Sequence, residues 1–364
     1  MPSPPNYDAI VIGAGAGGLC AAARLAHAGL RPLVVESRDR LGGRASTEQI
    51  DGHKVNVGAI ALELGGVFEE TFDLIDAPLD VREPSPASAF YLNRKVVDVS
   101  KGGWSFLLNQ ITKRAAKVLG AFADAKTGNL PDGRLSTADW LGQYTKNETA
   151  HAVFRNLCAA IFAANADELP ARAFLTYFTQ KGAFKRFGFC PDGTIGVWRS
   201  LAAGIERLGG TIWLDSACTA VQIEDGIVSG VTVRRDGQDV VLPAKTVISN
   251  VGPALTLALA GTGEFPASYA DAIAQDLRPA ANIVINLATR KRLFDAPGIV
   301  TFGKTRRLCN IADLTATCPE MAPTGWHQYV AYAVPIPALG DFDNEDETAL
   351  AMADLKDQFP DLDL

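Results

Sequence analysis

The sequence has few of the residue patterns that hold metal ions, disulfide bonds or catalytic nucleophiles. It contains six cysteines without a C-x-x-C pair and four histidines without an H-E-x-x-H motif. A metal site is therefore not expected. Dispersed cysteines in a chain of 364 residues are more typical of reduced core residues than of a disulfide framework. There is no G-x-S-x-G motif, and no motif ties a cysteine to a histidine, so we assign no catalytic residue.

Long hydrophobic runs and a positive net charge are missing as well. No apolar run approaches the roughly 18 residues of a membrane-spanning helix. The opening residues, MPSPPNYDAI, have neither the basic segment nor the apolar core of a signal peptide. The net charge of −7 argues against a general nucleic-acid-binding protein. We therefore expect a cytoplasmic protein without a nucleic-acid partner, either soluble or in peripheral contact with a membrane.

What remains is the composition of an ordinary globular protein. Hydrophobic residues make up 48% of the chain and charged residues 21%. A length of 364 residues is enough for about two domains with a sizeable core.

The most informative segment is a glycine-rich turn between a short apolar run and a helix-forming stretch. Residues 7–12 have the composition of a buried parallel strand, and residues 19–28 are rich in Ala and Leu. Between them, Gly13, Gly15 and Gly18 give the spacing G-x-G-x-x-G. The first glycine permits a tight turn, the second lets backbone approach a pyrophosphate, and the third lets the helix pack on the strand. This order predicts a dinucleotide-binding unit.

Glu36 is the residue of this unit that we expect to contact the ribose. It follows a second apolar run, residues 33–35, and lies 18 residues beyond Gly18. An acid about 20 residues after the motif accepts hydrogen bonds from ribose hydroxyls, and its charge would repel a 2′-phosphate. The nucleotide contacts predicted in this unit are Gly13, Gly15, Ala16, Gly17, Gly18, Glu36 and Ser37.

Residues 39–44, DRLGGR, carry a resemblance to a known class of proteins. They resemble the second fingerprint of FAD enzymes of the glutathione-reductase-like type 2 class. This class includes the flavin amine oxidases, protoporphyrinogen oxidase, the phytoene (carotenoid) desaturases and the Rab GDP-dissociation inhibitors. Gly42 and Gly43 let backbone N–H groups face the phosphates, and Arg44 adds a cation. The resemblance implies that the cofactor is FAD and not NAD.

Two later segments are similar to the phytoene desaturase branch. Residues 191–193, PDG, look like its P-x-G-G segment. Residues 244–250, AKTVISN, look like its A-D-x-V-V-S-N segment, with Lys245 where Asp is usual. Asn56 stands where the class often has Asp, which weakens a polar contact near the flavin. The further FAD contacts that the resemblance implies are Gly58, Val221 and Asn250.

Local patterns predict several elements outside the glycine-rich unit. Residues 90–97 are typical of a hairpin, and residues 104–180 are mainly helical in pattern. The spacing of apolar residues predicts a helix over 194–207. Residues 282–288 and 328–334 indicate later strands outside the nucleotide fold.

The predicted fold class is α/β. It is a Rossmann-like FAD-binding domain with an inserted α+β substrate domain, as the resemblance implies. The FAD-binding domain has two parts, residues 1–85 and 189–265. A mainly helical insert covers 86–188, and the sheet and helices of the substrate domain cover 266–364.

The resemblance implies an FAD-dependent oxidoreductase of the desaturase type. It would transfer a hydride from a C–H bond of an apolar, isoprenoid- or lipid-like substrate to the flavin. One alternative is a flavin amine oxidase of the same class. Another is a non-catalytic binding protein or a fragment, because the late Gly-Asp motif that closes the flavin site is missing: residues 340–341 are the only late Gly-Asp pair and lead into the acidic stretch FDNEDE. The electron acceptor, proton acceptor and oligomeric state stay unassigned.

Residues 172–189 admit two interpretations. They contain six aromatic residues, four cations and no acid. This composition suits a lipid-facing patch that contacts a membrane peripherally. We favour the second interpretation, in which the aromatic residues lie in the core and the cations lie on a solvated face.

Overall fold

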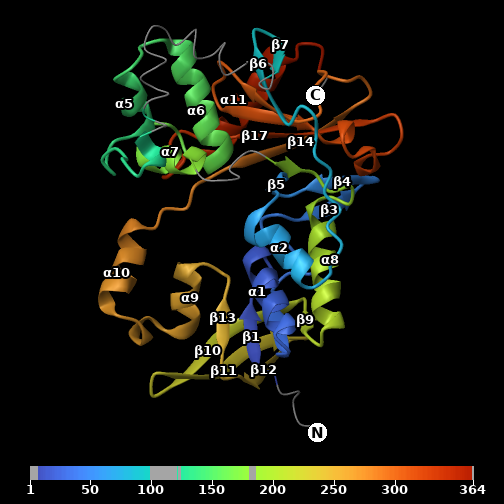
Figure 1. Cartoon of the computed structure of the whole chain (residues 1–364), viewed down its shortest axis with the longest axis vertical. Coiled ribbons are helices and arrows are strands. Elements are labelled where there is room, and N and C mark those ends of the chain that lie inside the picture. Colours follow the sequence, from blue (N-terminus) through green and yellow to red (C-terminus); the bar gives the residue numbers. More distant parts are fainter. Residues whose placement is uncertain (1–6, 99–120, 122–123, 180–185, 363–364) are drawn as a thin grey trace. The chain divides into compact units, whose positions relative to one another are not determined.

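The computed structural model describes residues 7–98, 121, 124–179 and 186–362 (Figure 1). The chain divides into two compact units. Unit 1 comprises residues 1–49, 54–81 and 190–277, and unit 2 comprises residues 50–53, 82–189 and 278–364. The division of the chain into the four domain ranges given above stays a prediction.

A four-stranded parallel sheet, in the order β13-β1-β2-β9, forms the centre of unit 1. Its strands are β1 (Ala9–Ile12), β2 (Pro32–Val35), β9 (Thr211–Trp213) and β13 (Val247–Ser249). β1 and β2 are buried along their whole lengths, as expected for parallel strands covered on both faces. Because β1 is an inner strand, its carboxyl end is flanked by those of β13 and β2.

Three helices share one apolar core with this sheet: α1 (Ala16–His27), α2 (Gly66–Leu74) and α8 (Thr194–Arg207). Small residues such as Ala22 and Ala23 are fully buried on α1, so α8 can approach it closely. Trp198 and Leu201 are the matching large residues on α8. The rest of the helical part is α9 (Pro253–Ala260), the short 3-10 helix η2 (Thr262–Glu264) and α10 (Ala267–Asp276).

A three-stranded antiparallel sheet, β10-β11-β12, completes unit 1. Its strands are β10 (Ser216–Glu224), β11 (Ile227–Arg235) and β12 (Gln238–Pro243). Both connecting turns are Asp-Gly pairs with positive φ, such as Asp225 (φ 52°) and Gly226 (φ 73°), which suit tight hairpins. The chain also forms the hairpin β3 (Thr47–Ile50) with β4 (His53–Asn56), and the short strand β5 (Leu62–Glu63).

Unit 2 is built on a six-stranded sheet in the order β14-β17-β16-β15-β6-β7. Its strands are β6 (Ser88–Leu92), β7 (Lys95–Asp98), β14 (Ile283–Thr289), β15 (Ile299–Phe302), β16 (Leu308–Asp313) and β17 (His327–Ala333). The pairing of β15 with β6 is parallel, whereas the other neighbours pair antiparallel. The sheet therefore joins residues 88–98 to strands from the last part of the chain.

Helices of unit 2 pack against this sheet. α6 (Glu148–Phe162) contacts β15, β16 and β17. Leu355 of α11 (Asn344–Gln358) and Phe359 belong to an apolar cluster with Tyr329 of β17. The remaining elements are α5 (Thr137–Gly142), α7 (Ala171–Thr179), β8 (Phe187–Gly188), and the 3-10 helices η3 (Leu314–Ala316) and η4 (Pro319–Met321).

Several sequence predictions are confirmed at the level of elements. The helix predicted over 194–207 has those bounds in the structure. The predicted hairpin at 90–97 is β6 and β7, with Asn93 and Arg94 in the left-handed conformation at its turn. The predicted late strands are β14 and β17, in the sheet of unit 2. The described part of the predicted helical stretch at 104–180 contains the helices α5, α6 and α7, whereas residues 104–120, 122–123 and 180 lie outside the described residues.

The described part of the aromatic segment 172–189 favours the core interpretation. Phe174, Phe187 and Phe189 are each at most 2% exposed. Arg172 is exposed, and Arg186 forms an ion pair with Glu83 at 2.7 Å. Residues 180–185 lie outside the described residues, and peripheral membrane contact stays a prediction.

Candidate nucleotide-binding site

The glycine-rich turn of unit 1 joins β1 to α1 with little room for side chains. Gly13 has φ 96°, which favours glycine. A Cβ added at Gly18 would lie 2.0 Å from the carbonyl oxygen of Gly13. The third glycine of the motif therefore permits close contact between helix and strand. Gly15, the N-cap residue of α1, has no side chain to cap the helix, so the first-turn amides have no side-chain acceptor there.

Asn250, at the end of β13, lies against the same turn. Its backbone N–H donates to the carbonyl of Ile12 at 2.8 Å. A Cβ at Gly17 would lie 2.6 Å from Asn250 Oδ1, and one at Gly15 would lie 3.0 Å from Nδ2. The structure therefore brings Asn250 together with Gly15, Gly17 and Gly18, although Asn250 lies more than 200 positions away in the sequence.

The second predicted turn is bonded directly to the first. The N–H of Gly42 donates to the carbonyl of Ala14 at 2.8 Å, and Gly15 and Gly42 form an isolated parallel bridge. Gly42 and Gly43 both have positive φ, at 99° and 58°. A Cβ at Gly42 would also lie 2.5 Å from the ring of Trp198. Only glycine fits this position without displacing an indole ring from the core.

Arg44 and Gly58 meet through their backbones beside this turn. Arg44 is an exposed residue. Its backbone carbonyl accepts a hydrogen bond from the N–H of Ala59 at 3.0 Å. A Cβ at Gly58 would lie 1.9 Å from that carbonyl oxygen. Gly58 is therefore required for close packing against the second turn, and it lies next to the proposed phosphate region.

Glu36 is 8% exposed and uses both carboxylate oxygens at the end of β2. Oε2 accepts from the N–H of Ala14 at 2.8 Å, and Oε1 accepts from the N–H of Arg38 at 3.0 Å. The hydroxyl of Ser37 donates to Oε1 at 3.3 Å. Because each carboxylate oxygen can accept more than one hydrogen bond, the group retains capacity for a ribose hydroxyl.

Val221 is placed differently from the other predicted contacts. It lies on β10, opposite Val231, and its half-buried side chain packs against the apolar cluster that contains Tyr7 and Ile10. This side chain stabilises the sheet. A contact between its backbone and a nucleotide stays a prediction.

Sequence reasoning missed the group that caps α8. The N-cap residue, Gly193, has no side chain, and its φ is 71°. Asn56 Oδ1 accepts from the N–H of Thr194 at 3.3 Å, and the hydroxyl of Thr47 accepts from the N–H of Ile195 at 3.3 Å. The two side chains are joined by a 2.6 Å hydrogen bond that Thr47 donates. Asn56 thus holds the start of α8 in place. The sequence signal for a cap supplied from elsewhere in the chain was the glycine at the N-cap position, Gly193.

Lys54 fixes the turn that precedes α8. Its ammonium group donates to the carbonyl of Pro191 at 3.0 Å and to Asp192 Oδ1 at 2.6 Å. The lysine side chain is 18% exposed, so the ion pair is shielded on one side. The Pro-Asp-Gly segment singled out in the sequence is therefore held from β4.

The thiols and acids of the described residues offer no alternative centre. All six cysteines are free. Burial raises the pKa of Cys158 and of Cys309 to about 12, so both are neutral thiols near pH 7. In the ranges that the structure describes, no group of three or more His, Cys, Asp or Glu residues could hold a metal ion.

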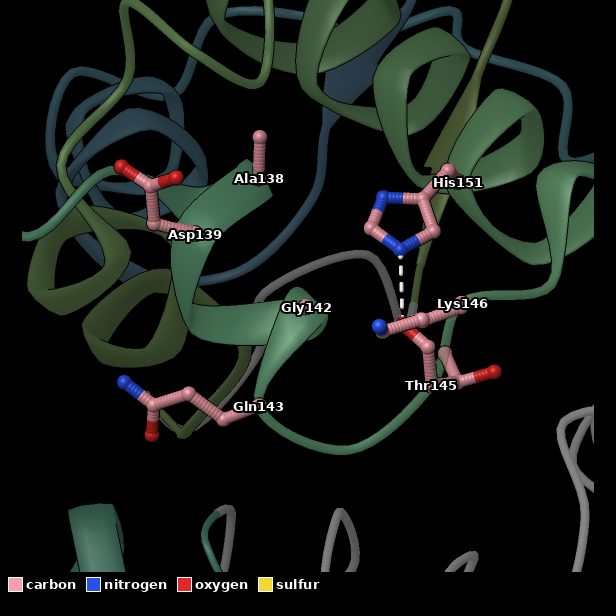
Figure 2. A pocket seen from close by; sticks show the side chains of 7 residues that line it. All are labelled: Ala138, Asp139, Gly142, Gln143, Thr145, Lys146 and His151. Atoms are coloured by element: carbon pink, nitrogen blue, oxygen red, sulfur yellow. Dashed lines mark hydrogen bonds between the residues drawn. The ribbon is translucent and has the colours of Figure 1, made fainter.

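A hollow of about 610 Å³ in unit 2 is shown in Figure 2. It is lined by residues of α5, of the connection that follows it and of the start of α6, among them Asp139, Lys146 and His151. His151 Nε2 lies 2.9 Å from the carbonyl oxygen of Thr145, which can only accept, so this nitrogen carries the proton. None of the predicted cofactor contacts lines this hollow.

No helix within the described ranges combines the length and apolar character needed to cross a membrane.

The chain is similar to proteins of a flavin-containing family. A family model described as flavin containing amine oxidoreductase matches residues 16–363. The pseudooxynicotine dehydrogenase of a Pseudomonas species is 53% identical over 53 residues, which cover 15% of this chain and 11% of that protein. The phytoene desaturase of Phycomyces blakesleeanus is 40% identical over 78 residues, which cover 21% of this chain and 13% of that protein. The alignments thus span only a small part of these curated relatives.

A structural comparison extends over nearly the whole chain. An oxidoreductase from Methanosarcina mazei matches 97% of this chain and 84% of its own, with a TM-score of 0.84 and 24% identity. Such a likeness shows the fold alone. Together with the family model, it confirms the predicted α/β FAD-binding fold class, the predicted resemblance, and flavin as the cofactor of the matched family.

Proposed function

Because the chain belongs to the family of flavin-containing amine oxidoreductases, we propose that it is an FAD-dependent oxidoreductase that dehydrogenates an apolar substrate. The hydride would leave a C–H bond of an isoprenoid or lipid-like molecule, in the manner of the phytoene desaturases. Support for this substrate class comes from similarity to desaturases such as that of Phycomyces blakesleeanus.

One observation carries the proposal: two glycine turns and a buried acid meet at the carboxyl end of a parallel sheet. The bond from Gly42 to Ala14 and the bond from Ala14 to Glu36 connect all three parts. In open α/β sheets, ligands bind outside the carboxyl ends of the strands. The arrangement suits the ADP half of FAD, with the pyrophosphate at the start of α1 and the ribose beside Glu36.

The residues proposed to hold FAD are those predicted from the sequence and from its resemblance to FAD enzymes. The N–H groups of Gly13, Ala14 and Gly42 are donated within the protein, so the proposed phosphate donors are other backbone N–H groups of the two turns. Added Cβ atoms would fill the space at several of the glycines. When bound, the flavin supplies the redox chemistry by accepting a hydride. The proposed contacts are Gly13, Gly15, Ala16, Gly17, Gly18, Glu36, Ser37, Gly42, Gly43, Arg44, Gly58, Val221 and Asn250.

A flavin amine oxidase is the second candidate, because the matched family model is described by amine oxidation. Its substrate would be an amine whose α-carbon loses the hydride. A cytoplasmic location and peripheral membrane contact belong to the proposal in the same way. The exposed Arg172 supports membrane contact, whereas the buried Phe174 and Phe187 count against it.

The visible spectrum of the purified chain is the first test. We expect flavin bands after purification or after reconstitution with FAD, at close to one FAD per chain. Turnover of polyenes and of amines, each with oxygen and with a quinone as electron acceptor, then separates the two substrate classes. A chain that is colourless after incubation with excess FAD and removal of the unbound FAD would contradict the proposal. It would favour a non-catalytic binding protein that has retained the fold.

A further inference from the structure

We propose that unit 2 carries a second small-molecule site, which binds an amphiphilic anion: a carboxylate or phosphate head on an apolar body. The site is a cavity of about 800 Å³. Its walls come from the β6–β7 hairpin, the start of α6, the residues after β15 and the end of α11. None of the residues assigned to FAD lines it, so the inference goes beyond the proposed function.

Apolar side chains of the β6–β7 hairpin contribute to the lining of the cavity. Tyr91 is 7% exposed, and its ring packs against Phe302 and Phe359 with centroids 5.6 Å and 5.3 Å apart. Leu92 and Val97 also line the cavity, and they pack against a different apolar cluster, which contains Phe90 and Phe154. Ligand cavities are commonly about 300–1,000 Å³ and mostly apolar, with a few polar groups that orient the ligand. This cavity has the size for an alkyl chain or a small ring, and apolar side chains are among its lining residues.

Its charged groups are predominantly cations. Arg94, Lys95 and Lys304 line the cavity, and among the described lining residues Asp357 is the only acid. The carboxylate of Asp357 is already paired with Arg306 at 2.7 Å. The lining therefore has an excess of positive charge, which excludes a cationic ligand and attracts an anionic head group.

Arg94 and Lys95 are available to a ligand, and Lys304 can exchange its partner Glu148 for a ligand. Arg94 uses its Nη2 to donate to the backbone oxygen of Asp357 at 3.0 Å, which orients a guanidinium that carries five N–H donors. Lys95 forms no ion pair with another described residue. Lys304 lies 3.2 Å from Glu148, but these side chains are 61% and 87% exposed, so the pair is weak and water-screened.

The cavity is also held in shape by its surroundings. Arg94 lies at the hairpin turn with φ 60°, a conformation fixed by the pairing of β6 with β7. Its bond to the backbone at Asp357 joins this turn to the end of α11. Because the cations come from two separate turns, they can approach one head group from two sides.

Calorimetric titration of the full chain tests the site. We expect octanoate or octyl phosphate to bind with one molecule per chain and at least tenfold more tightly than 1-octanol. The double variant Lys95→Gln/Lys304→Gln should weaken binding of the better anion at least tenfold. The matched control is Lys126→Gln/Lys291→Gln, which removes two exposed lysines outside the cavity and should bind like the unmodified chain.

The outcomes are distinct from those of the flavin test. Tighter binding of octyl phosphate than of octanoate supports a phosphate head, and the reverse order supports a carboxylate. The proposal is overturned if 1-octanol binds as tightly as both anions, if no ligand binds, or if the double variant matches the control. Thermal unfolding of each variant verifies that the fold is retained, and none of these results depends on bound FAD.

Discussion

Glu36 acts at the residue scale as a connector between the first glycine turn and the end of β2. Its two oxygens accept backbone N–H groups from Ala14 and Arg38, on either side of the proposed ribose position. A carboxylate suits this place because hydrogen bonds to a charged acceptor are stronger than neutral ones. Glutamine has the same shape but would place an NH₂ group against a backbone donor.

The variant Glu36→Gln should therefore weaken FAD binding. Hydrogen bonds to charged groups are worth about 1.5–3 kcal/mol, which corresponds to roughly 10- to 100-fold in Kd. Titration of the apoprotein with FAD, followed by flavin fluorescence, measures the change. Glu264→Gln, at an exposed acid in η2, is the matched control. Equal Kd values for the two variants would refute the role of Glu36.

Gly18 tests the packing role of the third glycine. Because an added Cβ would lie 2.0 Å from a backbone oxygen, neither neighbour can yield without moving β1 or α1. Gly18→Ala should lower the free energy of unfolding by about 1–3 kcal/mol, the usual effect of overpacking. Urea denaturation measures it. Gly142→Ala, at the last residue of α5 with open space around it, should be neutral or slightly stabilising; a similar loss in both variants would contradict the packing argument.

Glu168 ties two parts of unit 2 together at the scale of elements. It lies between α6 and α7, and its Oε1 accepts from the N–H groups of Ala338 at 2.8 Å and Leu339 at 3.0 Å. Its Oε2 accepts from the side chain of Asn165 at 2.7 Å. The carboxylate therefore holds the connection between the helices against the segment that follows β17.

The hydrogen bonds of Glu168 predict that the stability of the fold depends on pH. Burial pushes the pKa of Glu168 upwards, but hydrogen bonds from Leu339, Asn165 and Ala338 outweigh burial and leave the pKa below its ordinary value. A lowered pKa in the folded state means that the stabilisation is complete above the unfolded value, about 4.3, and is lost as pH falls through the folded pKa. Thermal unfolding from about pH 3 to 7 should show a Tm advantage over Glu168→Gln that shrinks only at the acidic end. Glu70→Gln, at a 67% exposed side chain, is the control, and a pH-independent difference would contradict the link.

At the scale of the whole molecule, local chemistry accounts for what the sequence predicted. The order of strand, turn, helix and acid within residues 9–44 depends on neighbours in the chain, so each part could be recognised before folding. The cap on α8 could not be recognised in this way, because Asn56 and Thr194 are 138 positions apart. Only the fold brings them together.

Strands β15 and β16 were missed for a different reason. They have 4 and 6 residues and are buried throughout, so no alternation of polar and apolar residues marks them. α11 was missed because its first turn is acidic; the structure shows that Asp343 caps it and accepts from the N–H groups of Glu345 and Asp346. Acids at a helix N-terminus stabilise the helix, although the same composition is common in loops.

FAD binding should slow hydrogen exchange more in the two turns of unit 1 than in the rest of the chain. A ligand that binds only the folded state stabilises it by about 2.7 kcal/mol at a hundredfold excess over Kd. Hydrogen exchange should therefore slow most in residues 13–18 and 36–44, where the turns and Glu36 are connected by hydrogen bonds. Mass spectrometry of peptides with and without FAD measures this, and residues 171–179 of α7 serve as the internal reference. If those reference peptides were protected as strongly as the two turns, FAD would act by general stabilisation, and the proposed ADP site would lose its support.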